Sequence, residues 1–187
     1  PNGTEYLGSG RQLGELSARY RRQGGDWQDA DTNSAGPLVL ESRFETQSDA
    51  LVWTLTARNT GSEPLEIGDL AVPLPIGAGS RRGGPVLLKH GLVCGHGSFL
   101  FWMRSDNVGP HLTLTPSGDT HLEFWETQSR QYRVYIHSTV AGGEAKERAC
   151  NWRQPHTSLT LAPGASKTYG FKFHWADDYD AVRQILV

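Results

Sequence analysis

The 187-residue chain carries 18 lysines and arginines against 20 aspartates and glutamates, so its formal net charge is only −2. Its adjacent basic residues, Arg21-Arg22 and Arg81-Arg82, form runs too short for a nucleic-acid-binding surface, and no apolar stretch approaches the length of a membrane span. The composition includes 22 glycines, 10 prolines and six each of tryptophan, tyrosine and phenylalanine, which favours a β-rich chain with many turns.

Alternating apolar and polar residues predict a series of strands along the chain. The clearest lies at 51–58, where Trp53 and Leu55 share one face. Further strands are predicted at 16–21, 38–44, 65–67, 70–72, 86–93, 99–103, 112–115, 121–125, 133–137, 158–161 and 168–175. The polar segment 27–37 is expected to be a loop, and a short helical turn is expected at 144–149.

Strands of this length and spacing, with almost no helix between them, predict an all-β fold, a two-sheet antiparallel β-sandwich of the supersandwich type. After Asp177-Asp178 the apolar period changes to that of a helix, and Asp is a favourable N-cap. We therefore expect a sandwich domain over residues 1–176. Residues 177–187 are expected to begin a linker helix that leads to an absent helical domain, because the chain reads as a piece of a longer protein.

Candidate substrate-binding residues gather in the stretch from His90 to Glu123, where polar groups are interleaved with apolar strand residues, and His90 is itself a candidate. Trp102 would stack on a sugar ring, and Arg104 would hold a uronate carboxylate in a bidentate fork. Core packing for Trp102 and a surface salt bridge for Arg104 are the alternatives. Glu123 either bonds sugar hydroxyls or pairs with Arg104 across strands. Trp152 lies in a predicted loop, as a binding residue or as a lid.

Candidate catalytic residues are those that transfer protons near neutral pH. His96, His137 and Tyr135 are candidate bases for a lyase, which removes the proton alpha to a carboxylate, and Arg104 would neutralise that carboxylate. The alternative for His96 is that it caps the glycine-rich turn around it. No pair of carboxyl groups at a diagnostic spacing singles out a hydrolase.

The sequence predicts no metal site and no cofactor. Cys94 and His96 share a strand face but have no further ligands at metal-binding spacing. Calcium is the one alternative, because the acidic cluster at 26–33 resembles a calcium loop that lacks its terminal carboxylate. The two cysteines, Cys94 and Cys150, either form a disulfide or remain separate buried thiols.

An ordered series of short motifs resembles the N-terminal β-sandwich part of a large family of mostly exported bacterial and fungal proteins. The motifs are Leu13-Gly14-Glu15, Tyr20-Arg21, Asp26-Trp27, Asn59-Thr60-Gly61, Pro64-Leu65-Glu66-Ile67-Gly68-Asp69-Leu70, Gly95-His96-Gly97-Ser98, Gly109-Pro110, Thr115-Pro116, Gly118-Asp119-Thr120, Leu122-Glu123-Phe124 and Tyr135-Ile136-His137-Ser138. This family is associated with carbohydrate-active enzymes such as the polysaccharide lyases that cut rhamnose–glucuronate linkages.

The resemblance implies a β-sandwich domain of a secreted or periplasmic polysaccharide-degrading enzyme, a lyase or a glycoside hydrolase. The implied partners are a polysaccharide or oligosaccharide, with uronate units among its sugars, and an (α/α) toroid that carries much of the active site. This chain lacks the toroid, so little turnover is expected from it alone. A free-standing carbohydrate-binding module and a purely structural interaction domain are the alternatives.

Overall fold

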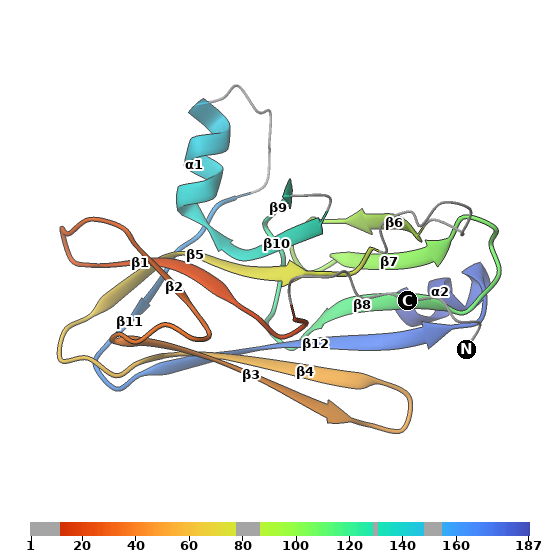
Figure 1. The fold of residues 1–187 in the computed structure, drawn as a ribbon, viewed down its shortest axis with the longest axis horizontal. Coiled ribbons are helices and arrows are strands. Elements are labelled where there is room, and N and C mark those ends of the chain that lie inside the picture. Colours follow the sequence, from red (N-terminus) through yellow and green to blue (C-terminus); the bar gives the residue numbers. More distant parts are fainter. Residues whose placement is uncertain (1–11, 78–86, 129–130, 148–154) are drawn as a thin grey trace.

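The computed structural model describes residues 12–77, 87–128, 131–147 and 155–187. Within them, two six-stranded antiparallel sheets stack on each other (Figure 1). The first sheet contains β1 (Ser17–Arg22), β2 (Gln28–Asp31), β5 (Leu65–Leu74), β9 (Phe124–Gln128), β10 (Gln131–Ser138) and β11 (Leu159–Leu161). The second contains β3 (Leu38–Thr46), β4 (Leu51–Asn59), β6 (Leu87–Leu92), β7 (Phe99–Arg104), β8 (His111–Ser117) and β12 (Ser166–Ala176). The predicted two-sheet sandwich is confirmed.

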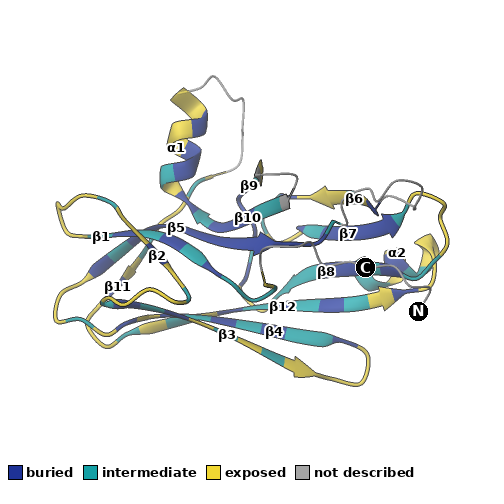
Figure 2. Ribbon diagram, in the orientation of Figure 1, coloured by how far each residue is buried: buried dark blue, intermediate teal, exposed yellow. Residues whose placement is uncertain are grey.

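The strand order explains which strands are central and which lie at an edge. The first sheet runs β2-β1-β5-β10-β9, with β11 also paired to β5, and the second runs β3-β4-β12-β8-β7-β6. The central strand β5 is almost wholly buried (Figure 2). β9 and β6 end their respective sheets.

The core lies between the sheets and follows the alternation visible in the sequence. Trp53 of β4 is fully buried, and its ring stacks on Phe44 at 5.2 Å and on Phe173 at 6.0 Å between centroids. Its indole N–H donates to the Ser42 hydroxyl at 2.6 Å, so the polar end of the side chain is satisfied inside the core. Such large aromatic side chains supply much of the apolar area that the fold removes from water.

Two helices accompany the sheets in the described part of the chain. α2 (Tyr179–Leu186) begins where the sequence predicts it, with the Asp178 carboxylate accepting the Ala181 N–H at 2.8 Å. Its Val182 packs on Phe101 and Met103, so β7 is buried on both faces. Neither helix is long and apolar enough to cross a bilayer.

Two local predictions are wrong. The segment 27–37 is not all loop, because β2 forms there against β1, with Ala30 buried and aligned with Ala18. A short helical turn is expected at 144–149, but the structure has a longer helix that begins earlier, α1 (Thr139–Glu147), directly after β10. Its first turn is fixed from outside the helix, since Asp69 accepts the Val140 and Ala141 N–H groups at 3.0 Å each.

Candidate functional site

A groove of about 670 Å³ lies on the outer face of the first sheet, beside α1. Among the described residues, six carboxylates and two guanidinium groups line it, so this part of the lining is acidic. These charged residues are Glu15, Asp29, Asp31, Asp69, Glu126 and Glu144 against Arg19 and Arg133. We call this hollow the outer groove.

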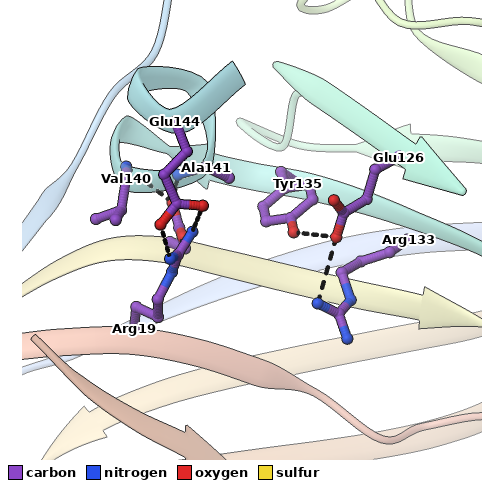
Figure 3. Close-up of polar contacts among 8 residues, drawn as sticks. Arg19, Glu126, Arg133, Tyr135, Val140, Ala141 and Glu144 are labelled. Atoms are coloured by element: carbon purple, nitrogen blue, oxygen red, sulfur yellow. Dashed lines mark hydrogen bonds and ion pairs between the residues drawn. The ribbon is translucent and has the colours of Figure 1, made fainter. Parts of the chain in front are cut away.

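One ionic cluster at the outer groove joins three elements (Figure 3). Arg19 of β1 donates from Nε to Asp69 of β5 at 2.5 Å and from Nη1 to Glu144 of α1 at 2.5 Å. Burial raises the pKa of the Asp69 carboxyl above its ordinary value, although the Ala141 N–H and Arg19 favour the ionised form. Burial opposes the charge of Arg19, but its hydrogen bonds to Glu144 and Asp69 raise its pKa overall. The cluster therefore holds α1 against the sheet.

A second cluster at the outer groove surrounds Tyr135 (Figure 3). The Tyr135 hydroxyl donates to Glu126 Oε1 at 2.7 Å, and Arg133 Nη1 donates to the same oxygen at 3.3 Å. Burial and the Glu126 carboxylate raise the pKa of Tyr135 well above its ordinary value. The phenol is therefore protonated near neutral pH, so in this structure it can donate a hydrogen bond or a proton, whereas a base would have to lose that proton first.

A β-bulge in β10 decides which side chains reach the outer groove. The pairing with β5 shifts between Tyr135, which is opposite Ala71, and His137, which is opposite Leu70. Tyr135 consequently faces the outer groove, while His137 bonds Tyr169, a member of the inner core. The two candidate bases therefore lie on opposite faces of one strand.

Glu123 is buried and anchors a hydrogen-bonded chain at the end of β10. One of its oxygens accepts from the Ser138 hydroxyl and from the Thr157 N–H, each at 2.9 Å. The other accepts from the Thr157 hydroxyl. A carboxylate only accepts, so both hydroxyl protons point toward Glu123, and each hydroxyl oxygen is left to accept from a histidine.

This order of donors determines the tautomers of two histidines. His137 Nδ1 lies 2.7 Å from the Thr157 hydroxyl and His156 Nδ1 lies 2.8 Å from the Ser138 hydroxyl, so each ring must donate from Nδ1. His137 Nε2 then accepts from the Tyr169 hydroxyl at 2.6 Å. Burial lowers the pKa of His137, which favours this neutral form.

Two further candidates, His96 and His90, lie on other surfaces of the molecule. His96 is exposed, and its ring meets that of His121 edge-on at 4.3 Å between centroids. His90 on β6 is exposed and stacks on Phe101 at 4.8 Å. Neither contact joins the outer groove, whose lining includes Tyr135 alone among those predicted site residues that the structure describes.

Trp102 and Arg104 of β7 occupy different environments. Trp102 is fully buried in the core, so it presents no face on which a sugar could stack in this structure, and the core alternative describes its position. Arg104 donates from Nη2 to Asp106 at 2.6 Å within its own hairpin. Trp152 lies outside the described residues, as does Cys150, while Cys94 is a half-buried free thiol.

The described residues contain no group of three or more His, Cys, Asp or Glu side chains that could hold a metal ion. In the acidic cluster at 26–33, Asp31 accepts the Asn33 N–H at 2.8 Å and the Ser34 hydroxyl at 2.9 Å. These bonds stabilise the turn that follows β2.

The comparisons place the fold among known structures. No family model matches the sequence, and no curated protein matches it. Its fold is similar to that of a solved structure titled "Polysaccharide Lyase BACCELL_00875", with a TM-score of 0.67 and 17% sequence identity. The match covers 93% of this chain and 27% of the lyase, so the chain spans about a quarter of that protein's length. The predicted likeness to a polysaccharide lyase is confirmed at the level of fold.

Proposed function

We propose that the chain is the β-sandwich domain of a polysaccharide-degrading enzyme and that its outer groove forms part of the substrate cleft. The observation that carries the proposal is the fold shared with part of a polysaccharide lyase over 93% of this chain. Fold alone does not determine function, so the chemistry of the groove must support the same conclusion.

The outer groove offers groups that suit saccharide hydroxyls. Carboxylates such as Glu126 accept hydrogen bonds and guanidinium groups such as Arg133 donate them, while the single O–H of Tyr135 is held by Glu126. The excess of carboxylates opposes a polyanion inside the groove and favours the hydroxyl-rich, uncharged units of a glycan. The polar lining and the open shape are those of a site for an extended chain rather than a small apolar ligand.

Catalysis is assigned to the whole enzyme, in which a helical toroid would close over the sandwich. In a lyase reaction a base removes the proton alpha to the uronate carboxylate while a cation neutralises that carboxylate. Lyase chemistry, the toroid and export of the protein stay predictions from the family resemblance. The isolated chain is expected to bind glycan and to turn it over very slowly.

Affinity electrophoresis and calorimetry on a panel of neutral and acidic polysaccharides test the proposal. Glu126→Gln removes one carboxylate from the groove and is expected to weaken glycan binding by about tenfold. The control Glu41→Gln changes an exposed carboxylate of β3, paired with Arg58 on the second sheet, and is expected to bind like the parent. Circular dichroism verifies that both variants fold. A parent chain that binds no glycan in the panel contradicts the proposal.

A free-standing carbohydrate-binding module is the second candidate, because the described residues of this chain supply both hydrogen-bond acceptors, such as Glu126, and donors, such as Arg133, to the outer groove. The two candidates differ in what happens to bound glycan in the full-length protein. An enzyme produces new chain ends, and for a lyase these carry an unsaturated bond that absorbs ultraviolet light. A module binds equally well and releases no product.

A further inference from the structure

At one side of the sandwich the edge strand β6 of the second sheet lies near β10 and the edge strand β9 of the first sheet. Lys89 of β6 places its ammonium nitrogen 3.2 Å from the centroid of the Tyr132 ring on β10. Trp125 of β9 stacks on the same tyrosine, with 5.0 Å between ring centroids and 5° between planes. We call Lys89, Trp125 and Tyr132 the seam, because they connect the open edges of the two sheets.

Trp125 is prepared for stacking in a way that the buried Trp102 is not. It is 37% exposed, and Tyr132 holds its ring parallel to its own. A supported indole loses little freedom when a flat ligand covers its remaining surface, so its apolar area contributes to binding at low entropic cost. The C–H face of a sugar ring is such a ligand. Trp125 also adjoins Glu126, which lines the outer groove from the opposite face of the same strand.

Lys89 adds a positive charge to this aromatic surface. No carboxylate of the described residues forms an ion pair with it, and the ring of Tyr132 is its counterpart. Burial lowers the pKa of Lys89 to about 8, because the charged ammonium group loses hydration there and gains no anion from the described residues in return. An anion that arrived with a ligand would remove much of that cost.

The distribution of charge separates the seam from the outer groove. The described lining of the groove has six carboxylates and two guanidinium groups, which oppose an anionic substituent there. The seam has one ammonium group and two aromatic rings. We propose that the seam is a subsite for an anionic glycan segment: one sugar ring covers the free face of Trp125, and the carboxylate or sulfate of a neighbouring unit meets Lys89 on the other side of Tyr132. This inference rests on the proposed function and adds where charge is accepted along the glycan: uncharged units in the outer groove and an anionic unit at the seam.

Calorimetric titration of the chain with three tetrasaccharides of equal length tests the subsite: an oligouronate, a sulfated oligosaccharide and a neutral oligosaccharide. Lys89→Met keeps the hydrocarbon stem over Tyr132 and is expected to weaken binding of the anionic ligands by about tenfold, with the neutral ligand unchanged. Lys89→Arg keeps the charge and is expected to retain anionic affinity. Trp125→Ala is expected to weaken all three by about tenfold. The controls are Lys172→Met and Trp175→Ala, a lysine and an exposed tryptophan of β12.

The outcomes separate the subsite from the proposed function. The oligouronate and the sulfated ligand, compared with each other, show which anion the seam prefers, and selective loss of either in Lys89→Met supports the subsite. Anionic binding that survives both Lys89→Met and Trp125→Ala overturns it. Binding of the neutral ligand alone also overturns it and leaves the proposed function standing. If no ligand binds the parent chain, both proposals are wrong.

Discussion

At the scale of single residues, the buried His111 ring lacks hydrogen-bond partners among the described residues, and its effect on stability can be measured. It is 1% exposed on β8, and neither ring nitrogen has a hydrogen-bond partner in the described part of the chain. Phe101 and Tyr179 surround it, and burial lowers its pKa although Asp178 acts in the opposite direction. A buried polar group without a partner costs about 1–3 kcal/mol.

His111→Leu is therefore expected to raise the free energy of unfolding by about 1 kcal/mol at neutral pH. The unfolded chain takes up a proton at its ordinary histidine pKa, 6.5, whereas the folded chain does so only at lower pH. The neutral folded form is thus favoured above pH 6.5, and this contribution is lost as pH falls through the folded pKa. Urea denaturation at about pH 8 and about pH 5.5 should show a smaller loss on acidification in the variant. Equal losses in both proteins would exclude this role.

The chain anchored on Glu123 gives a second prediction at this scale. Because Ser138 and Thr157 donate their hydroxyl protons to Glu123, His137 and His156 should both carry their ring proton on Nδ1. Nitrogen-15 chemical shifts of the imidazole rings report the tautomer directly. A proton on Nε2 of either ring would contradict the donor order described above.

At the scale of elements, α1 offers a matched pair of adjacent glycines. A Cβ at Gly142 would lie 2.2 Å from the ring of His156, whereas a Cβ at Gly143 meets nothing within 4 Å. Alanine favours a helix over glycine by about 0.8–1.0 kcal/mol, so Gly143→Ala should stabilise the protein by up to about that amount. Gly142→Ala should destabilise it, because His156 would have to leave Ser138. Thermal unfolding compares the two variants, and equal stabilisation by both would show that α1 does not pack on His156.

The elements were largely predictable from sequence, and the exceptions have local causes. β4 and β12 alternate strictly, so the pattern predicts their buried faces correctly through Trp53 and Phe171. β2 is not predicted from the sequence because it is short and polar, and its single buried residue, Ala30, gives no alternating pattern. β7 differs from β4 and β12 because residues 99–103 are all apolar, so the pattern does not separate an inner from an outer face, and α2 covers the outer one. A strand's period cannot show what covers its second face.

At the scale of the whole molecule, the outer groove could not be predicted because its residues are distant in sequence. Arg19 meets Asp69 across 50 residues and Glu144 across 125. Tyr135 was identified as a residue type suited to chemistry, but its separation from His137 depends on a bulge that no periodicity records. Charged residues that alternate outward on β1, β5 and β10 were the available signal, and it indicates an outer face without indicating a groove.

The central claim is that a glycan follows the outer groove and crosses the edge of β9 to the seam. Mapping amide chemical-shift changes while the isotopically labelled chain is titrated with a bound oligosaccharide tests it most directly. The account predicts that the largest changes cluster at Arg19, Glu126 and Tyr135 in the groove and at Trp125 and Lys89 in the seam. Largest changes on the β3–β4 hairpin, with the groove and the seam unaffected, would contradict it.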